Sequence, residues 1–132
     1  MTDNNLSQYP FADILGISLD SEDDGKIVLR MKRNEVNVGG VRNSINGGIL
    51  ATYAEIAAHV AINSKMLFGS EIKHTQDLSA AYLESAISDF IMAEAHVQRM
   101  GKTATVTVDL KDETLEKTFC ICRVTCSVGK ID

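Results

Sequence analysis

No segment of this sequence is long and apolar enough to cross a membrane, and basic residues are not in excess. A transmembrane helix needs about 18 or more apolar residues in a row, whereas the apolar stretch 49–62 is shorter and interrupted. Lysine and arginine number 13 against 18 aspartates and glutamates, so the net charge is −5. We therefore expect neither a membrane span nor binding to nucleic acid, which a negatively charged protein repels.

The marks of secretion and of a disulfide-stabilised fold are also missing. The first residues, MTDNNLSQ, lack the charged and then apolar pattern of a signal peptide, so we expect a cytoplasmic protein. An odd number of cysteines in such a chain argues against a disulfide framework. The spacing of Cys120, Cys122 and Cys126 fits no common zinc site. On a strand all three lie on one apolar face, so we interpret them as small core side chains.

Nucleotide-binding fingerprints and metal clusters are absent as well. Residues 37–40, NVGG, do not form a Walker or dinucleotide motif. The three histidines, His59, His74 and His96, do not suggest a set of metal ligands. We therefore expect no cofactor and no metal. The composition, 45% apolar and 23% charged, is typical of one globular domain, which we place at residues 1–132 with a flexible start at residues 1–8.

Hydrophobic periodicity predicts an α+β fold with one long buried helix, from about Gly47 to about Lys65. Pro10 at the start and Gly16 just past the end indicate a short helix before it. About five segments are typical of strands: 26–33, 76–83, 91–99, 103–111 and 118–128. Because most strands follow one another, the sheet should be mostly antiparallel. It should curl around the helix, and its open edges favour pairing with a second copy.

One acid interrupts the apolar helix. Between Gly48 and Asn63 the only ionisable side chains are Glu55 and His59. A buried carboxylate is costly unless it is paired, hydrogen-bonded or protonated, so Glu55 is a candidate for chemistry. Thr52, Glu55 and His59 are spaced three and four residues apart and share one stripe with Gly48. The alternative is a structural contact between Glu55 and His59 that faces a subunit interface.

The helix begins at a glycine pair that follows an asparagine, Asn46-Gly47-Gly48. The first turn of a helix has unpaired N–H groups and a partial positive charge, and glycine lets a ligand approach the backbone closely. Asn46 is a favourable N-cap residue. These features predict an oxyanion site. The alternative is that the glycines only permit a sharp entry into the helix and tight packing on the sheet.

This arrangement resembles the hot-dog fold acyl-CoA thioesterases, particularly the small single-domain branch related to the phenylacetate-pathway thioesterase. The resemblance covers residues 11–128 and is most specific at Asn46-Gly47-Gly48 followed by Glu55. The family typically has His-Gly-Gly there, with an acid eight residues after the first glycine. Two further segments match the family's apolar pattern: 75–83 and 93–102.

The resemblance implies a role for each matched residue. The Gly47 amide would polarise a thioester carbonyl, Glu55 would attack that carbonyl or activate water, and Thr75 would position the water. Asn46 takes the place of the family's histidine at the catalytic site. His59 occupies the place of a threonine found in another branch. We expect His59 and its neighbour on the stripe, Gly48, to contact the substrate.

The resemblance also implies a substrate and an assembly. Active sites of the family lie across a dimer interface, so the amide and the acid would come from different subunits of a homodimer or a dimer of dimers. Coenzyme A carries phosphates, so cations should line the entrance. Arg99 and Lys102, which flank a turn, and Lys130 after the last strand are the candidates.

Two departures from the family pattern favour a rival function. The family histidine is Asn46, and Gly40 stands where many relatives carry Asn or Gln, with Asn37 and Asn43 out of register. Our first hypothesis is an acyl-CoA thioesterase. The rival is a non-catalytic hot-dog module that binds acyl-CoA or acyl carrier protein as a sensor or regulator. A hot-dog dehydratase is a weaker choice, because those enzymes pair a loop histidine with the acid and no histidine precedes Glu55.

Overall fold

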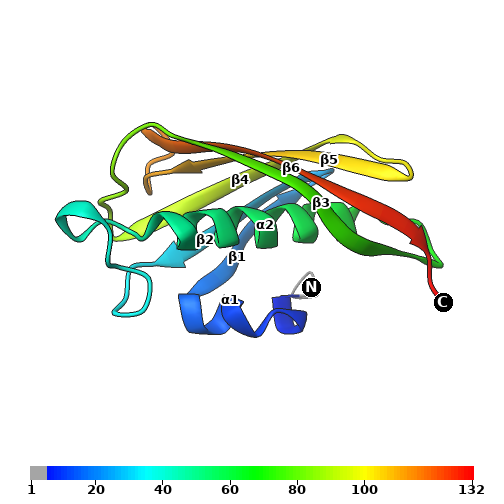
Figure 1. The fold of residues 1–132 in the computed structure, drawn as a ribbon, viewed down its shortest axis with the longest axis horizontal. Coiled ribbons are helices and arrows are strands. Elements are labelled where there is room, and N and C mark those ends of the chain that lie inside the picture. The colour runs from blue at the N-terminus through cyan, green and yellow to red at the C-terminus, as the bar shows by residue number, and fades with distance from the viewer. Residues whose placement is uncertain (1–5) are drawn as a thin grey trace.

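A six-stranded antiparallel sheet curls around one long helix in the computed structural model, which describes residues 6–132 (Figure 1). The strands are β1 Ile17–Asp23, β2 Lys26–Lys32, β3 Ser70–Tyr82, β4 Phe90–Arg99, β5 Thr103–Lys111 and β6 Thr118–Lys130. The helices are α1 Pro10–Leu15 and α2 Gly47–Ser64, with short 3-10 turns η1 Leu6–Gln8 and η2 Val41–Asn43. Strand order is β1-β2-β4-β5-β6-β3, and every neighbouring pair is antiparallel. The predicted hot-dog arrangement is therefore confirmed.

The long helix forms where the sequence predicts it and is capped as predicted. The Asn46 side-chain oxygen accepts hydrogen bonds from the N–H groups of Gly48, at 2.8 Å, and Ile49, at 3.3 Å. The side of α2 toward the sheet is apolar and fully buried, which stabilises the helix by packing. The Tyr53 hydroxyl donates to the Ile91 carbonyl at 2.8 Å and ties α2 to β4. No helix in residues 6–132 has the length and apolarity to cross a bilayer.

The strand count of about five is wrong by one, because β1 was missed. This strand reads ISLDSED, and only Ile17 is buried. It is an edge strand that pairs only with β2, through a bulge between Leu19 and Ser21. An edge strand exposed to water needs no apolar alternation, so periodicity does not reveal it. The start of β3 was also placed too late, at residue 76, whereas the strand begins at Ser70 and includes His74 and Thr75.

The cysteines are core side chains, as predicted. Cys120, Cys122 and Cys126 are free thiols with at most 1% of their surface exposed. Across residues 6–132, no group of three or more His, Cys, Asp or Glu side chains is arranged to hold a metal ion. At the other end of the chain, residues 6–8 form the turn η1, although the sequence analysis expected a flexible segment over 1–8. Residues 1–5 of that expected segment lie outside the described part.

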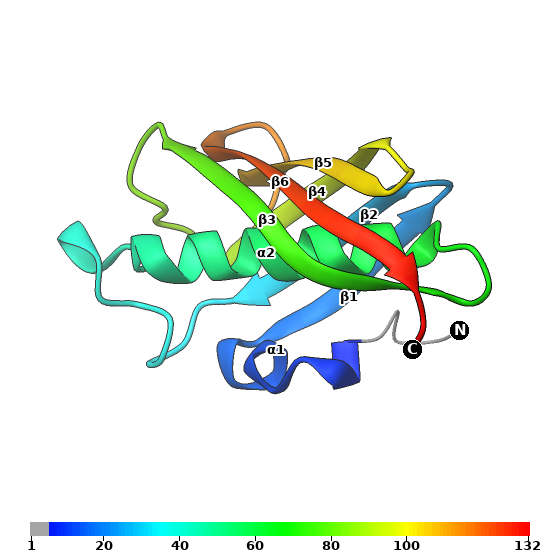
Figure 2. The same ribbon diagram turned by 45° about the vertical axis from the view of Figure 1, so that its right-hand side comes forward.

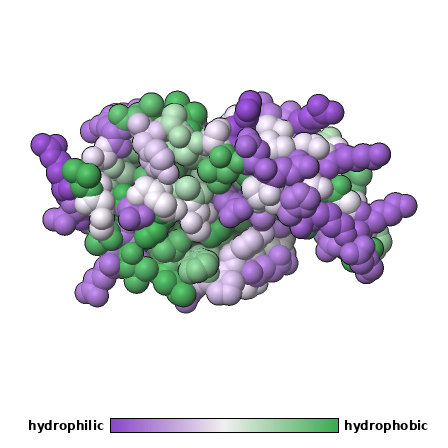
Figure 3. All heavy atoms as spheres, in the orientation of Figure 1, coloured by the Kyte–Doolittle hydropathy of each residue, from purple (hydrophilic) through white to green (hydrophobic). Residues whose placement is uncertain are grey.

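The two edges of the sheet differ. β1 is short and polar, whereas β3 has 13 residues and crosses in front of α2 together with β6 (Figure 2). α1 lies on the side of α2 that the sheet leaves uncovered (Figures 1 and 2). In the orientation of Figure 1, Figure 3 shows many apolar side chains on the half of the molecule that includes the start of α2, and mostly hydrophilic ones on the other half. Four exposed apolar residues belong to α1 and the loop before α2: Phe11, Ile14, Val36 and Val41.

Candidate functional site

The side of α2 that lies outside the core carries a stripe of small and polar residues. Its members follow one another at intervals of three or four residues, the spacing that aligns side chains along a helix: Gly48, Thr52, Glu55, His59 and Asn63. None of them is buried, although they belong to the same helix as nine core residues. The polar stripe, as we call these five residues, is the surface of α2 that a ligand or a second protein copy can reach.

Glu55 lies in the middle of the polar stripe and is half-buried. Among residues 6–132, no group forms a hydrogen bond or ion pair with its carboxylate. Glu55 therefore forms no hydrogen bond with His59 within the described residues, although its charge acts on the His59 ring. The alternative of a structural contact at a subunit interface stays a prediction. A half-buried carboxylate without a protein partner keeps its acceptor capacity for a ligand or water.

His59 is instead bound on both sides of its ring. Its Nδ1 lies 3.0 Å from the hydroxyl of Tyr9, and its Nε2 lies 2.7 Å from Oγ1 of Thr75. The Tyr9 and His59 rings meet edge to face, with centroids 5.7 Å apart. Burial lowers the pKa of His59, and the nearby charge of Glu55 opposes this. His59 is therefore a neutral bridge between Tyr9 and Thr75 near pH 7.

Thr75 reaches the polar stripe from β3. It is half-buried and lies opposite Cys126 of β6, with 3.8 Å between Oγ1 and the sulfur. The structure thus brings together three residues that the sequence analysis selected separately, namely Glu55, His59 and Thr75. The fourth participant, Tyr9, was missed because nothing in the sequence links it to a residue 50 positions away.

The start of α2 offers one free amide. The Asn46 side chain occupies the N–H groups of Gly48 and Ile49, and the Leu50 N–H donates to the Asn46 carbonyl. Within the described residues, the Gly47 N–H has no hydrogen-bond partner. Asn46 therefore acts as a helix cap, and the Gly47 amide is the donor left for a ligand.

Tyr82, at the end of β3, contacts the residue that carries this amide. Its hydroxyl donates to the Gly47 carbonyl at 2.7 Å. Its ring would lie 3.6 Å from a methyl group added at Gly47, which is an ordinary contact. A cavity of about 290 Å³ opens beside them and is also lined by Leu50 and Ala86. Gly47 therefore lies at the wall of a cavity that both apolar and polar residues line.

No side chain replaces the orienting amide of the family at Gly40. A methyl group added there would collide with the Ser44 side chain and lie 3.0 Å from the Ile45 carbonyl, so both neighbours would have to shift to admit one. Asn37 is fully buried, and its amide donates to the carbonyls of Leu15, at 3.0 Å, and Lys32, at 2.8 Å. Asn37 therefore holds the loop before α2 to the rest of the fold.

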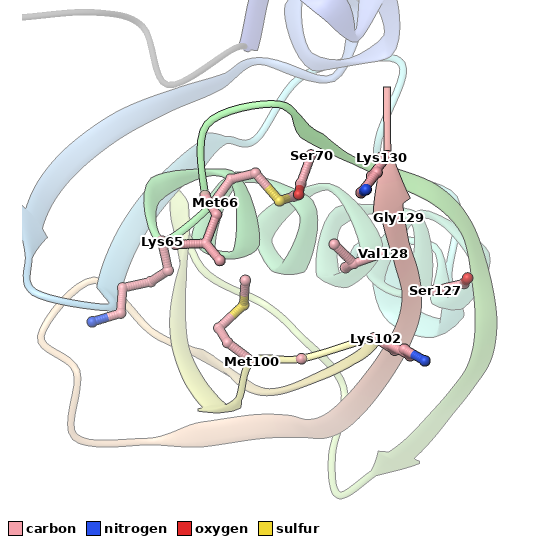
Figure 4. A pocket seen from close by; sticks show the side chains of 11 residues that line it. Lys65, Met66, Ser70, Met100, Lys102, Ser127, Val128, Gly129 and Lys130 are labelled. Carbon is pink, nitrogen blue, oxygen red and sulfur yellow. The ribbon is translucent and has the colours of Figure 1, made fainter. Parts of the chain in front are cut away.

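A larger cavity of about 720 Å³ opens at the other end of α2 (Figure 4). The side chains of Met66 and Met100 project into it, while the amino group of Lys102 lies at its rim (Figure 4). Lys130 lines it too, and neither lysine forms an ion pair with any residue from 6 to 132. Arg99 is exposed but does not line this cavity. The structure thus unites two of the three predicted cations around one hollow and leaves Arg99 outside.

Comparisons with known proteins agree on one family. A family model described as the thioesterase superfamily matches residues 42–118. A thioesterase from Haemophilus influenzae is 22% identical, with 98% of this chain and 92% of that chain covered and a TM-score of 0.87. Zebrafish thioesterase superfamily member 2 is 25% identical over 98% and 99% of the chains, at a TM-score of 0.81. A phenylacetic acid degradation-related protein from Ralstonia eutropha is 18% identical over 90% and 89%, at 0.80. A search of curated sequences gave no match.

Proposed function

The chain belongs to the thioesterase superfamily, and on this premise we propose that it hydrolyses acyl-CoA thioesters to a free acid and coenzyme A. The observation that carries the proposal is the polar stripe of α2. It presents a half-buried Glu55 carboxylate without a partner among residues 6–132. One helical turn further along, His59 contacts the hydroxyl of Thr75. The Gly47 amide at the helix start, which has no hydrogen-bond partner in residues 6–132, supports the proposal.

These groups fit the steps of the reaction. Glu55 takes a proton from a water molecule as that water attacks the thioester carbonyl carbon. The Gly47 N–H donates to the carbonyl oxygen as negative charge develops there. The carbon–sulfur bond then breaks, and the thiolate of coenzyme A takes the proton from Glu55. Water and thioester are the only reactants, so this route needs no cofactor or metal, and that expectation of the sequence analysis stays a prediction.

A second copy of the chain is part of the proposal. Glu55 follows Gly47 by eight residues, which separates them by about 12 Å along the helix axis and is too far for one carbonyl group. Contacts of Gly47 with Tyr82 and of His59 with Thr75 show that α2 runs antiparallel to β3. Two copies paired antiparallel along the β3 edge would therefore place their helices antiparallel. Glu55 of one copy then approaches Gly47 of the other if the two-fold axis passes near Ala51.

The test of the proposal is a thiol-release assay across a panel of acyl-CoA chain lengths and aryl groups. We expect turnover by the wild type, and a loss of roughly 10²-fold or more in kcat for Glu55→Gln, the scale of a general base. Glutamine keeps the shape of the side chain, so binding of a non-hydrolysable acyl-CoA thioether should be kept. Equal turnover by the two proteins would remove Glu55 from the mechanism.

A non-catalytic acyl-CoA or acyl carrier protein sensor is the second candidate. It is favoured by Gly40, which carries no orienting side chain, and by Asn46, whose side chain is used as a helix cap. Tight binding of acyl-CoA without thiol release from any substrate, by wild type and Glu55→Gln alike, would support the sensor and contradict the hydrolase.

We also propose that Lys102 binds phosphate groups of coenzyme A at the rim of the larger cavity. Because the lysine is exposed, the contact is screened and worth up to about 1 kcal/mol. Lys102→Gln should therefore raise KM for acyl-CoA by up to about fivefold without lowering kcat, and added salt should reduce the difference. Arg99→Gln is the matched control, and a larger rise in KM for that variant would place the phosphates outside the cavity.

A further inference from the structure

A network of hydrogen-bonding side chains joins four segments of the protein, three of them elements of the fold, at the polar stripe. It begins at Tyr9, which precedes α1, passes through His59 of α2 to Thr75 of β3, and reaches Cys126 of β6. The two contacts of the His59 ring, at 3.0 and 2.7 Å, are short, whereas the contact from Thr75 to the sulfur is 3.8 Å long. These side chains lie close together only because the fold brings four distant segments to the same place.

The protonation of Tyr9 and His59 favours one direction for the hydrogen bonds of this network. Burial raises the pKa of Tyr9 and lowers the pKa of His59, so the phenol keeps its proton and the imidazole is neutral. The Tyr9 hydroxyl lies 3.0 Å from Nδ1 of His59, and a neutral imidazole has one nitrogen that can accept a hydrogen bond. The favoured arrangement has the Tyr9 hydroxyl donate to Nδ1.

The same donor-to-acceptor direction continues from His59 to Thr75. A neutral imidazole has one donor and one acceptor nitrogen, so Nδ1 as acceptor requires a proton on Nε2. The Nε2–H group then donates to Oγ1 of Thr75 over 2.7 Å. Thr75 must direct its own proton elsewhere, and the acceptor in reach is the sulfur of Cys126, which accepts weakly. The hydroxyl proton of Thr75 is thus oriented but loosely held.

We propose that Tyr9 and His59 are positioning residues, which turn the Thr75 hydroxyl so that it donates a hydrogen bond to the water molecule that Glu55 activates. This inference rests on the proposed function. Glu55 and His59 are four residues apart, so their side chains are neighbours on the helix surface and a water bound to Thr75 lies within reach of the carboxylate. Such a water donates one hydrogen to Glu55, accepts one from Thr75, and keeps a lone pair for the carbonyl carbon.

The direction of the hydrogen bonds from Tyr9 through His59 to Thr75 can be tested without measuring turnover. Nitrogen-15 NMR of the imidazole rings reports which nitrogen carries the proton, and the signal of His59 is identified by its loss in His59→Gln. We expect the Nε2–H form in the wild type at pH 7, with a weaker hydrogen bond at Nδ1 in Tyr9→Phe. A ring with its proton on Nδ1 would overturn the inference. Because this measurement uses the wild-type protein, it does not depend on whether a variant folds.

A double-mutant cycle tests the effect on catalysis. Tyr9→Phe should lower kcat about fivefold, the scale of one hydrogen bond, with KM unchanged, and Thr75→Val should lower it further. If Tyr9 acts through Thr75, adding Tyr9→Phe to Thr75→Val should have no further effect. Thr75→Ser, which keeps the hydroxyl, should restore most of the activity.

The matched control is Tyr53→Phe, which removes a phenol that donates to the Ile91 carbonyl on the opposite side of α2. It should lower stability and leave kcat unchanged. Independent, multiplying effects of Tyr9→Phe and Thr75→Val in an active enzyme would overturn the inference alone. Absence of turnover in the wild type, with His59 in the expected Nε2–H form, would instead overturn the proposed function. The catalytic role of the Tyr9–His59–Thr75 hydrogen bonds would then fall with it.

Discussion

The two sides of α2 differ in burial and in how their polar groups are satisfied. On the side toward the sheet, Tyr53, Ala57 and Ala61 are fully buried, and the Tyr53 hydroxyl is satisfied by a backbone carbonyl. On the polar stripe, His59 is bridged to two distant segments, while Glu55 has no partner in the described residues. The comparison shows why a carboxylate persists in an otherwise apolar helix. It stays half-solvated on the open side, so it avoids the cost of full burial.

Removal of the Gly47 amide should have the largest effect. Proline at the first position of a helix is well tolerated and lacks an N–H group, so Gly47→Pro deletes the proposed donor while α2 still forms. We expect kcat to fall about 10²–10³-fold, measured by thiol release. Gly47→Ala keeps the N–H group and is the control. Similar activities of the two variants would show that the amide does not contact the carbonyl oxygen.

The same variant shows whether the site needs two copies. Mixed dimers of Gly47→Pro and Glu55→Gln combine one intact amide with one intact acid in a single site only if the two groups come from different subunits. Refolding equal amounts of the two inactive proteins together should then restore roughly a quarter of the wild-type activity, because half of the dimers are mixed and each has one complete site. No recovery would place amide and acid in the same subunit.

Overpacking the other side of α2 should affect stability instead of catalysis. Ala57 is fully buried against the sheet, so Ala57→Leu has no space for its extra atoms and should lower the free energy of unfolding by about 1–3 kcal/mol. Urea denaturation measures this loss, and kcat per folded molecule should stay close to the wild-type value. A fall in kcat as large as that of Gly47→Pro would mean that the two sides do not act separately.

The smallest effect that we expect is a pH dependence from the polar stripe. Burial lowers the pKa of His59 below its ordinary value of 6.5 in the folded protein, against the opposing charge of Glu55. The unfolded chain therefore binds more protons, so the free energy of unfolding should decrease as the pH falls from 6.5 toward the lowered folded value. His59→Gln should remove this component of the pH dependence. A wild-type protein that gains stability over the same interval, relative to the variant, would contradict the assignment.

Local patterns predicted much of the fold and part of the site. The glycine pair, the cap of Asn46 and the spacing of the polar stripe are short-range features, and the structure has all three. The edge strand β1 was missed because it is exposed to water and has no apolar alternation. Asn37 was noted as a nearby amide, but its side chain donates its hydrogen bonds to carbonyls of α1 and β2. A sequence does not show which polar groups another segment has already satisfied.

The sequence by itself determined where α2 begins and that one acid stands alone among its apolar neighbours, because helix caps and helical spacing depend on residues a few positions apart. The expectation of a wholly buried helix was wrong on one side, since no residue of the polar stripe is buried. Only the tertiary structure decided that His59 bonds to Tyr9 and Thr75, which lie 50 and 16 positions away, instead of to Glu55. The physical reason is that a hydrogen bond needs its atoms within about 3 Å, and only the curled sheet and the N-terminal segment bring those atoms to the open side of the helix.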